Sequence, residues 1–471
     1  MFKRKNKNAF TLVELLAVIV ILAIILVIAV PQIMNVIKDT TKASLESSAK
    51  MVAAQVENQY TVAQTLSKEF GKTGNCMQDW AGLNSTDYAS CTYEIDANGN
   101  AKVTIKGQGK FKGLYACNAT RSSATATEEE CAANTLVTHI QSLYANEATR
   151  TSNGLTQDNT SDQNIRYAGS NDAVKNYVEF GNTDELWRII GTFEVEKASG
   201  GTEELVKIIR EDSIGYIPWD TSDSTINSGF GINQWGESGS YEGADLMQLL
   251  NGKYLSKQDV ESACYNWTTA EMGTCNFSST GMSSTYKNMI ENVVWNTGAL
   301  NWDDPNIYDQ DTNVLNTVNL YNAERGSETG KKCTSGDKCD DNITRTTEWE
   351  GLVALPYLTD WGYASSESEC RNNLEDGFDF ENNDFTNGTC KKNNWMHYGT
   401  TGVPTEITWM LSPIANSDNA HGVSLVYGDG VVDYGYAALL FRVRPTIYLK
   451  STVQIEDGDG SSGNAYKLKL S

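Results

Sequence analysis

The sequence predicts an α+β protein: a long N-terminal transmembrane and amphipathic helix packed on a small antiparallel sheet, then a larger disulfide-pinned α+β module. Three observations predict this. An apolar N-terminal run continues into an amphipathic stripe, the ten cysteines all follow residue 75 in close couples, and strand and helix patterns mix after residue 165. Because 471 residues exceed one compact core, we expect two domains behind the N-terminal segment.

The first element is the apolar run at residues 10–30, which only Thr11 and Glu14 interrupt. As a helix rising about 1.5 Å per residue, it would cross a hydrocarbon core of about 30 Å. Pro31 follows the run, where a secretory signal would have a small-residue cleavage site. The apolar run is preceded by four basic residues, Lys3, Arg4, Lys5 and Lys7. They predict a cytoplasmic N-terminus and an extracellular body on a single-pass anchor.

Glu14 is the unusual residue of this run, because a lone carboxylate near a membrane span is costly. The stretch "AFTLVELLAVIVILAIILVIAVPQI" resembles the class III leader of type IV pilins and pseudopilins. The resemblance implies that a prepilin peptidase removes residues 1–9 by cutting between Ala9 and Phe10, and that the new amine of Phe10 is methylated. Ala9 replaces the family's usual Gly. Glu14 becomes the fifth mature residue, and Pro31 takes the place of a helix-kinking proline.

The chemistry of the cut explains the acid. Cleavage leaves a cationic amine on Phe10, and the Glu14 carboxylate of a neighbouring subunit can pair with it. Such a pair satisfies both charges and fixes the axial register between subunits. We therefore interpret Glu14 as an assembly residue. The resemblance implies as partners other pilin subunits, the prepilin peptidase and, before assembly, the membrane.

The helix is predicted to continue beyond the membrane as far as residue 70. Apolar residues recur every three or four positions along this part: Leu45, Ala49, Val52, Val56, Tyr60, Ala63, Leu66 and Phe70. A helix over residues 10–70 would be about 90 Å long and kinked near Pro31. The stripe is short and only moderately apolar, so packing on the chain's own sheet is favoured over a coiled coil.

Residues 71–148 are predicted to form a pilin-like globular head. "CTYEIDANGNAKVTIKGQGKF" alternates as a hairpin with an Asn-Gly turn, "KGLYAC" would add a third strand, and 131–147 would form a helix. The "DANGN" turn lacks the ligand spacing of a calcium loop. Residues 149–164 have almost no apolar side chains and are predicted to be a linker.

The cysteines predict disulfides and an extracellular body. The chain has only three histidines, His139, His397 and His421, and no C-x-x-C, which disfavours zinc. Spacing alone does not fix connectivity, and free thiols are the alternative. The sequential couples are Cys76/Cys91, Cys117/Cys131, Cys264/Cys275, Cys333/Cys339 and Cys370/Cys390.

Residues 165–471 form the larger module. "LWRIIG", "VKIIRED", "LTDWGYASS", "WMLSP" and "FRVRPTIYLKS" resemble an extracellular module of low-GC Gram-positive gut bacteria that often follows a prepilin-type N-terminus. The segment "VSLVYGDGVV…FRVRPTIYL" is similar to the closing strands of C-type-lectin-like and formylglycine-enzyme-like folds. The formylglycine chemistry needs paired terminal cysteines, and the last cysteine here is Cys390, so that activity is not implied.

The net charge and the absence of known catalytic motifs disfavour several classes of function. A net charge of -23 disfavours nucleic acid. No HExxH, GxSxG or phosphate loop occurs, so we assign no catalytic residue, no metal and no cofactor, and expect no enzyme. The acidic stretch 374–384 could hold calcium or a glycosidase pair, but a solvated loop explains it equally. Seven tryptophans could stack on sugars or fill the core: Trp219, Trp235, Trp267, Trp302, Trp361, Trp395 and Trp409.

These observations together predict a minor type IV pilin-like subunit at the cell surface, carrying a module for adhesion to an extracellular ligand such as a glycan. The alternatives are a pseudopilin of a DNA-uptake or secretion machine, a hydrolase displayed on a pilin stalk, and a membrane-anchored receptor that never polymerises. Each of these differs from the prediction in a measurable activity.

Overall fold

The computed structural model describes most of the chain. The described residues are 12–68, 70–71, 73–96, 99–128, 131, 135–222, 229–237, 239–302, 304–309, 314–325, 346–375, 378–379, 384–385, 390, 393–397, 407–415, 421–428 and 430–470. The chain divides into two compact units, Met1–Ala132 and Ala133–Ser471.

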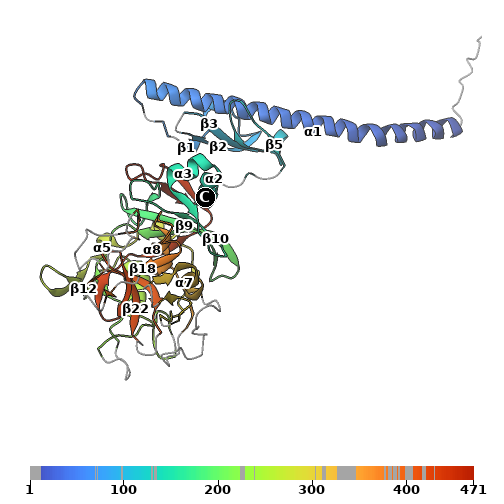
Figure 1. Cartoon of the computed structure of the whole chain (residues 1–471). Helices are drawn as coiled ribbons and strands as arrows, with labels where there is room; N and C mark the ends of the chain where they lie inside the picture. Colours follow the sequence, from blue (N-terminus) through green and yellow to red (C-terminus); the bar gives the residue numbers. More distant parts are fainter. Residues whose placement is uncertain are drawn as a thin grey trace, which may run out of the picture. The chain divides into compact units, whose positions relative to one another are not determined.

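The first unit is one long helix over a small sheet (Figure 1). Its elements are α1 (Leu12–Thr65), β1 (Thr73–Asn75), the 3₁₀ turn η1 (Asp79–Ala81), β2 (Tyr88–Ile95), β3 (Ala101–Gly107), the 3₁₀ turn η2 (Gly109–Phe111), β4 (Tyr115–Ala119) and β5 (Ala126–Thr127). The strands pair antiparallel in the order β1-β2-β3-β4-β5. The predicted hairpin and its third strand are confirmed.

Helix α1 packs on this sheet through the predicted stripe. Leu45, Ala49, Val52, Val56 and Ala63 are all buried, and strands β3 and β4 supply their partners. The predicted packing of the second helix half on the chain's own sheet is therefore confirmed.

The two ends of the predicted helix differ from expectation in detail. Helical structure continues through Pro31, where the sequence predicts a kink. The helix ends at Thr65 instead of residue 70, so Leu66 lies beyond it and is exposed rather than part of the stripe. Phe70 still reaches the core by stacking on Tyr93.

Helix carboxylates also hold the edges of the sheet. Glu46 accepts a hydrogen bond from the backbone N–H of Ala126 at 2.9 Å, and Glu57 accepts one from Ala101 at 3.2 Å. These bonds satisfy strand-end donors that the sheet itself leaves unpaired. The helix is thus attached to the head by apolar packing and by polar contacts at both ends of the packed region.

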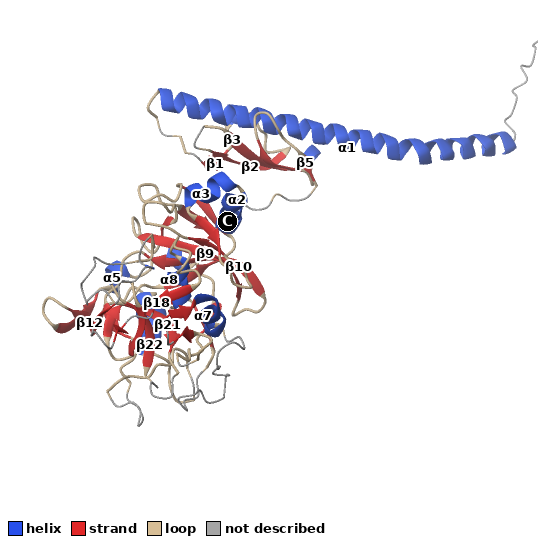
Figure 2. Cartoon of the chain, viewed as in Figure 1, coloured by secondary structure: helices blue, strands red, loops and turns tan. Residues whose placement is uncertain are grey.

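The second unit is a larger α+β body, and Figure 2 shows its short helices among several sheets. Its helices are α2 (Leu136–Ala145), α3 (Glu147–Asn153), α4 (Asp245–Leu249), the π-helix η3 (Leu250–Tyr254), α5 (Phe277–Thr280), α6 (Ser284–Lys287), α7 (Thr317–Glu324) and α8 (Leu358–Tyr363).

Its strands are β6 (Leu155–Gln157), β7 (Ile165–Tyr167), β8 (Tyr177–Glu179), β9 (Leu186–Glu196), β10 (Thr202–Arg210), β11 (Tyr216–Pro218), β12 (Val260–Asn266), β13 (Glu271–Cys275), β14 (Val293–Asn296), β15 (Tyr308–Asp309), β16 (Val314–Asn316), β17 (Glu348–Gly351), β18 (Asn373–Glu375), β19 (Phe378–Asp379), β20 (Asp384–Phe385), β21 (Thr408–Pro413), β22 (Gly422–Val426), β23 (Val432–Tyr436), β24 (Leu440–Arg442), β25 (Thr446–Leu449), β26 (Val453–Asp457) and β27 (Lys467–Leu470).

Two sheets organise this unit. One has the order β25-β10-β9-β7-β6, with β8 also paired to β9, and the other has the order β13-β12-β11-β24-β21-β22-β23. A single apolar core extends through both. The predicted mixture of strands and short helices is confirmed.

The boundary between the predicted head and module needs correction. The predicted helix at 131–147 exists as α2, but it belongs to the second unit, because the units divide after Ala132. The segment 149–164 is not a linker: it contains the end of α3 and strand β6, which pairs with β7. Some of its polar side chains are buried, and among these Asn164 donates a hydrogen bond to Asp158 at 2.9 Å.

The disulfides follow the predicted pairing by sequence order. Bonds join Cys76–Cys91, Cys117–Cys131, Cys264–Cys275 and Cys370–Cys390. Cys333 and Cys339 lie outside the described residues. Four of the five predicted couples are therefore confirmed, and the fifth stays a prediction.

Candidate assembly helix and recognition surface

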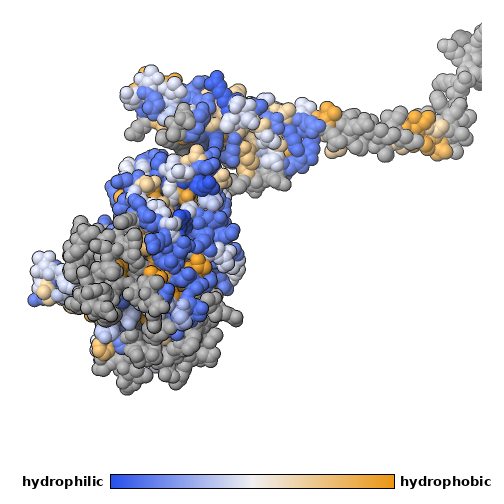
Figure 3. Space-filling view, in the orientation of Figure 1, coloured by the Kyte–Doolittle hydropathy of each residue, from blue (hydrophilic) through white to orange (hydrophobic). Residues whose placement is uncertain are grey.

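The N-terminal half of α1 extends beyond the sheet on which the second half packs (Figure 1). Every side chain described between residues 16 and 40 is exposed. In Figure 3 the projecting part carries hydrophobic atoms at its surface. The large apolar side chains exposed there are Leu16, Ile19, Val20, Ile21, Met34, Val36 and Ile37.

Two of the four predicted processing and assembly residues lie within helix α1. Ala9 and Phe10 lie outside the described residues. Glu14 and Pro31 lie within α1, but their side chains are not described. Over the part of the chain that the structure covers, no helix combines the length and the apolar content needed to span a bilayer. The transmembrane segment at 10–30 thus stays a prediction.

The seven tryptophans considered as a sugar platform separate clearly. Six of them are buried, with rings packed in the core of the second unit: Trp219, Trp235, Trp302, Trp361, Trp395 and Trp409. Trp267 is 49% exposed. The sequence could not distinguish these cases, since burial depends on how distant strands meet.

Trp267 forms an aromatic corner with Tyr216 and Tyr265. Its ring lies nearly perpendicular to both tyrosine rings, at interplanar angles of 79° and 83° and centroid distances of 5.8 and 5.0 Å. Tyr265 on β12 is the register partner of Tyr216 on β11 and of Met272 on β13. Tyr216 is in turn opposite Arg442 on β24. Opposite residues share a face, so these side chains form one cross-strand row.

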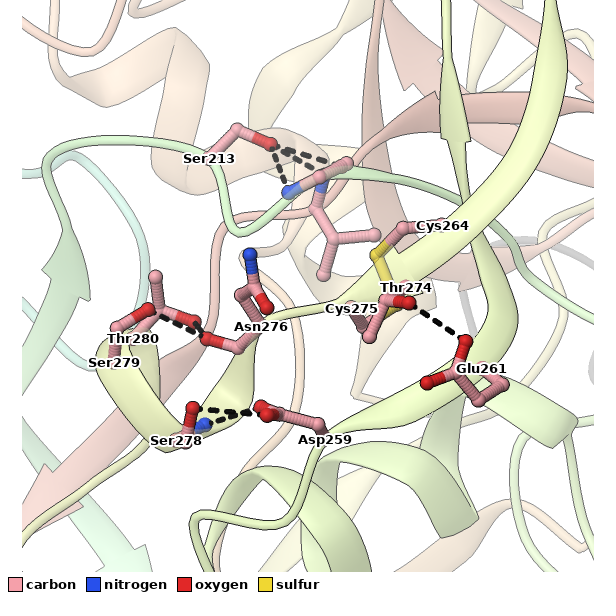
Figure 4. Close-up of a disulfide and its surroundings, with 12 residues drawn as sticks. Ser213, Asp259, Glu261, Cys264, Thr274, Cys275, Asn276, Ser278, Ser279 and Thr280 are labelled. Carbon is pink, nitrogen blue, oxygen red and sulfur yellow. Dashed lines mark hydrogen bonds between the residues drawn. A yellow bond between two sulfur atoms is a disulfide. The ribbon is translucent and has the colours of Figure 1, made fainter.

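The hairpin that carries Trp267 is pinned at its base by a disulfide (Figure 4). The bond joins Cys264 on β12 to Cys275 on β13, and Thr274 donates a 2.8 Å hydrogen bond across the hairpin to Glu261. At the other end, the Asn266 side chain accepts from the backbone of Thr268 at 2.9 Å. This Asx contact fixes the turn that begins at Trp267.

Gly215 lets the disulfide approach the sheet. Its φ of +145° disfavours other residues, and a Cβ at this position would lie 2.8 Å from Cys264 Sγ. The Ser213 hydroxyl accepts a hydrogen bond from the backbone N–H of Gly215 at 3.1 Å and another from the backbone N–H of Val443 at 3.2 Å. The base of the hairpin is therefore fixed next to Tyr216.

A second exposed aromatic patch lies around His421. Phe230, which is 40% exposed, stacks on His421 with ring centroids 4.8 Å apart, and Tyr436 packs on the same ring at 4.6 Å. Burial lowers the pKa of His421. The imidazole is thus favoured in its neutral form, as expected for a ring held between two aromatic side chains.

Ionised residues form a connected network in the core of the second unit. Arg166 donates to Asp158 at 2.7 Å and to Asp360 at 2.9 Å, and Lys207 donates to the other oxygen of Asp360. All four side chains are buried. Glu324, also buried, accepts from the backbone of Thr359 at 3.3 Å and from its hydroxyl. The network joins β7, β10, α7 and α8.

The burial of this network shifts its protonation equilibria. Desolvation lowers the pKa of Lys207 to about 8, although Asp360 opposes the shift. Desolvation also raises the pKa of Glu324 to about 7, against the effect of Arg325. Burial alone would raise the pKa of Asp360, but Lys207 and Arg166 together lower it. No sequence pattern predicts this network, because Asp360 lies 194 residues from Arg166 and 153 residues from Lys207.

A small crevice opens in the same unit, between α8 and the ends of β21 and β22. Its lining includes Trp361, Met396, His397, Met410 and Arg444. Arg444 is held in place by the carbonyls of Arg210 and Met396, at 2.9 and 3.1 Å. The guanidinium is thus engaged by backbone carbonyls and by Glu211, which lies 3.5 Å from it.

The last candidate site from the sequence is the acidic stretch 374–384. Most of the acidic stretch 374–384 lies outside the described residues. Within the described ranges, no group of three or more His, Cys, Asp or Glu side chains is arranged to hold a metal ion. The calcium and glycosidase interpretations of this stretch stay hypotheses.

Comparisons with known proteins identify the N-terminal segment. The prokaryotic N-terminal methylation motif matches residues 4–30. No curated protein and no solved structure matches the chain. The chain therefore has the N-terminal segment of type IV pilin-like and pseudopilin precursors, which implies processing by a prepilin peptidase and assembly with other pilin subunits.

Proposed function

We propose that this chain is a minor type IV pilin-like subunit, cut before Phe10, polymerised through Glu14, and displaying Ala133–Ser471 as an adhesion module. The observation that supports the proposal most directly is continuity: the methylation motif at 4–30 runs into α1, whose second half is built into the head. One helix therefore links the processing site to the folded body.

The exposed half of α1 requires a partner. Burying one Leu, Ile, Val or Met side chain stabilises by about 1.5–3 kcal/mol, so the row from Leu16 to Ile37 is strongly disfavoured in water. Membrane lipid would cover this surface before assembly, and the helices of neighbouring subunits would cover it in a filament. In the dry filament core, the Glu14 carboxylate would pair with the methylated amine of a neighbour.

The size of the second unit favours a minor or tip position. Ala133–Ser471 is far larger than the helix-and-sheet head in Met1–Ala132. A body of this size on every subunit would crowd a helical filament, whereas an occasional or terminal subunit avoids the clash. The disulfides of this unit suit an extracellular location.

Mass spectrometry of the natural protein, and counting of subunits in sheared filaments, test the proposal. We expect a mature chain that begins at methylated Phe10, and a Glu14→Ala variant that is processed but lost from filaments. Glu46→Ala is the matched control, since this carboxylate lies in the packed half of the same helix and contacts Ala126. A natural product that retains Met1, or normal incorporation of Glu14→Ala, would refute the polymerising role.

Pseudopilins share the same motif, so the secretion and DNA-uptake systems need a separate test. The net charge of -23 opposes direct contact with DNA. A gel shift with the full-length chain in detergent at low salt should show no complex. A tight complex would instead favour a DNA-uptake pseudopilin.

A further inference from the structure

We propose that the aromatic corner formed by Trp267, Tyr216 and Tyr265 is a binding site for a neutral sugar ring. This inference names the class of ligand that the adhesion module would bind. It rests on the proposed function, in which that module is displayed at the cell surface. Trp267 is 49% exposed, at the tip of a hairpin that projects from the second unit in Figure 1. Neither the methylation motif nor the core of the unit requires an exposed indole there.

The corner is preorganised. The Cys264–Cys275 bond fixes the base of the hairpin, Gly215 allows that bond to lie against the sheet, and Asn266 fixes the turn. Two tyrosine rings set edge-to-face hold the Trp267 ring upright. A rigid aromatic surface loses little entropy on binding, so its contact area converts efficiently into affinity.

The chemistry of the corner suits a sugar. The C–H face of a pyranose packs on an aromatic face, while its hydroxyls need hydrogen-bonding partners around the rim. The Tyr216 hydroxyl accepts from Arg442 Nε at 3.0 Å and can donate its own proton outward. Thr268 and Thr269 stand exposed in the same turn as Trp267. The corner therefore offers aromatic rings together with hydroxyl groups.

Other occupants fit less well. Trp267 and Met272, 49% and 41% exposed, offer together roughly 200 Å² of side chain, whereas a stable protein interface buries about 800 Å² on each partner. The net charge of -23 disfavours nucleic acid, acidic polysaccharide and anionic lipid surfaces. A neutral oligosaccharide is the ligand that both the area and the charge allow.

The test uses the full-length chain in detergent micelles on an array of neutral oligosaccharides built from glucose, galactose, mannose, xylose and N-acetylglucosamine. Heparin fragments and unmodified peptides on the same array represent the competing ligand classes. We expect at least one neutral family to bind, with its Kd then measured by calorimetry. An array on which only heparin or peptide binds, or on which nothing binds, overturns the proposal.

Variants locate the binding. Trp267→Ala should weaken the best ligand roughly 10- to 30-fold, the range of a buried aromatic anchor, and Trp267→Phe should retain part of the affinity. Phe230→Ala is the matched control, because this ring is similarly exposed but belongs to the His421 patch. Unchanged affinity in Trp267→Ala, or an equal loss in Phe230→Ala, contradicts the site. Near-native hydrogen exchange in each variant shows that folding is intact.

The same preparations separate this site from the proposed function. The N-terminus of each preparation is read by mass spectrometry before the array is probed. If a chain that does not begin at Phe10 binds sugar, the sugar site is supported and the proposed pilin function is refuted. If a correctly processed chain binds no neutral sugar, the sugar site is refuted and the proposed pilin function is unaffected.

Discussion

The two compact units of this protein have cores of different kinds. Among the described residues of Met1–Ala132 no charged side chain is buried, and the core is apolar, with carboxylates such as Glu46 and Glu57 only at its rim. The core of Ala133–Ser471 contains Arg166, Lys207 and Asp360, joined to one another. The first core tolerates many apolar sequences of similar volume, whereas the second requires each charge to meet its partner.

This difference between an apolar core and a charged core agrees with the function proposed for each unit. In the proposed function, the head only has to hold α1 so that its N-terminal half can pack against other helices. An apolar core without specific charge pairs is enough to hold the helix. The second unit holds long irregular segments at fixed positions around its sheets, and a network of charges specifies one arrangement among many. Paired charges in a core contribute little net stability, but the loss of one partner is severe.

The largest expected effect comes from breaking the charged core. Lys207→Met removes one of the two cations that donate hydrogen bonds to Asp360 and leaves Arg166, at 2.9 Å. We expect the second unit to lose about 3–5 kcal/mol of unfolding free energy. Hydrogen exchange with mass spectrometry on the full-length chain reports the two units separately, and the first unit should not change.

Lys38→Met is the matched control in the first unit. Lys38 also pairs with a carboxylate, Glu128 at 2.6 Å, but the pair is exposed. Solvent screens such a pair, so exchange in the head should be unchanged. If the two lysine variants were equally stable, the distinction between the cores would be wrong.

The next effect concerns the head, which is small and depends on its cross-links. The double variant Cys76→Ser, Cys91→Ser removes a bond that closes a loop with a sequence separation of 15. Chain-entropy reasoning gives a loss of about 3 kcal/mol for such a loop. Thermal unfolding followed by exchange should show the head opening first. Retention of full head stability would mean that apolar packing alone suffices there.

The smallest effect is a difference in pH dependence. Glu324 has a pKa raised from 4.5 to about 7 in the folded second unit, so folding favours its protonated form. Its contribution to stability is fully present below pH 4.5 and is lost as the pH rises through about 7. Glu324→Gln should therefore flatten the decline in stability of the second unit between pH 5 and 7, measured by denaturant midpoints. An unaltered slope in the variant would show that Glu324 is not its source.

Local patterns in the sequence were reliable guides where short-range geometry decides the outcome. The stripe from Leu45 to Ala63 became the buried face of α1, because helical periodicity alone brings those side chains onto one side. Cysteines close in sequence, such as Cys264 and Cys275, met because a hairpin places them together. The methylation motif required no fold at all to be recognised.

The polar segment 149–164 shows where such patterns fail. Its composition is that of a linker, yet Asp158 is buried and accepts from Arg166 and Asn164. A polar side chain looks the same in a sequence whether water or a buried partner satisfies it. The partner of Arg166 on the other side, Asp360, lies 194 residues away, and no local signal connects them.

The sequence by itself determined the N-terminal motif, the long helix with its buried stripe, the hairpins and the order of the disulfides, since each depends on neighbours along the chain. Only the tertiary structure decided which tryptophan faces water, where the first unit ends, and which charges meet in the second core. These outcomes depend on contacts between residues far apart in sequence, and such contacts exist only once the sheets have assembled.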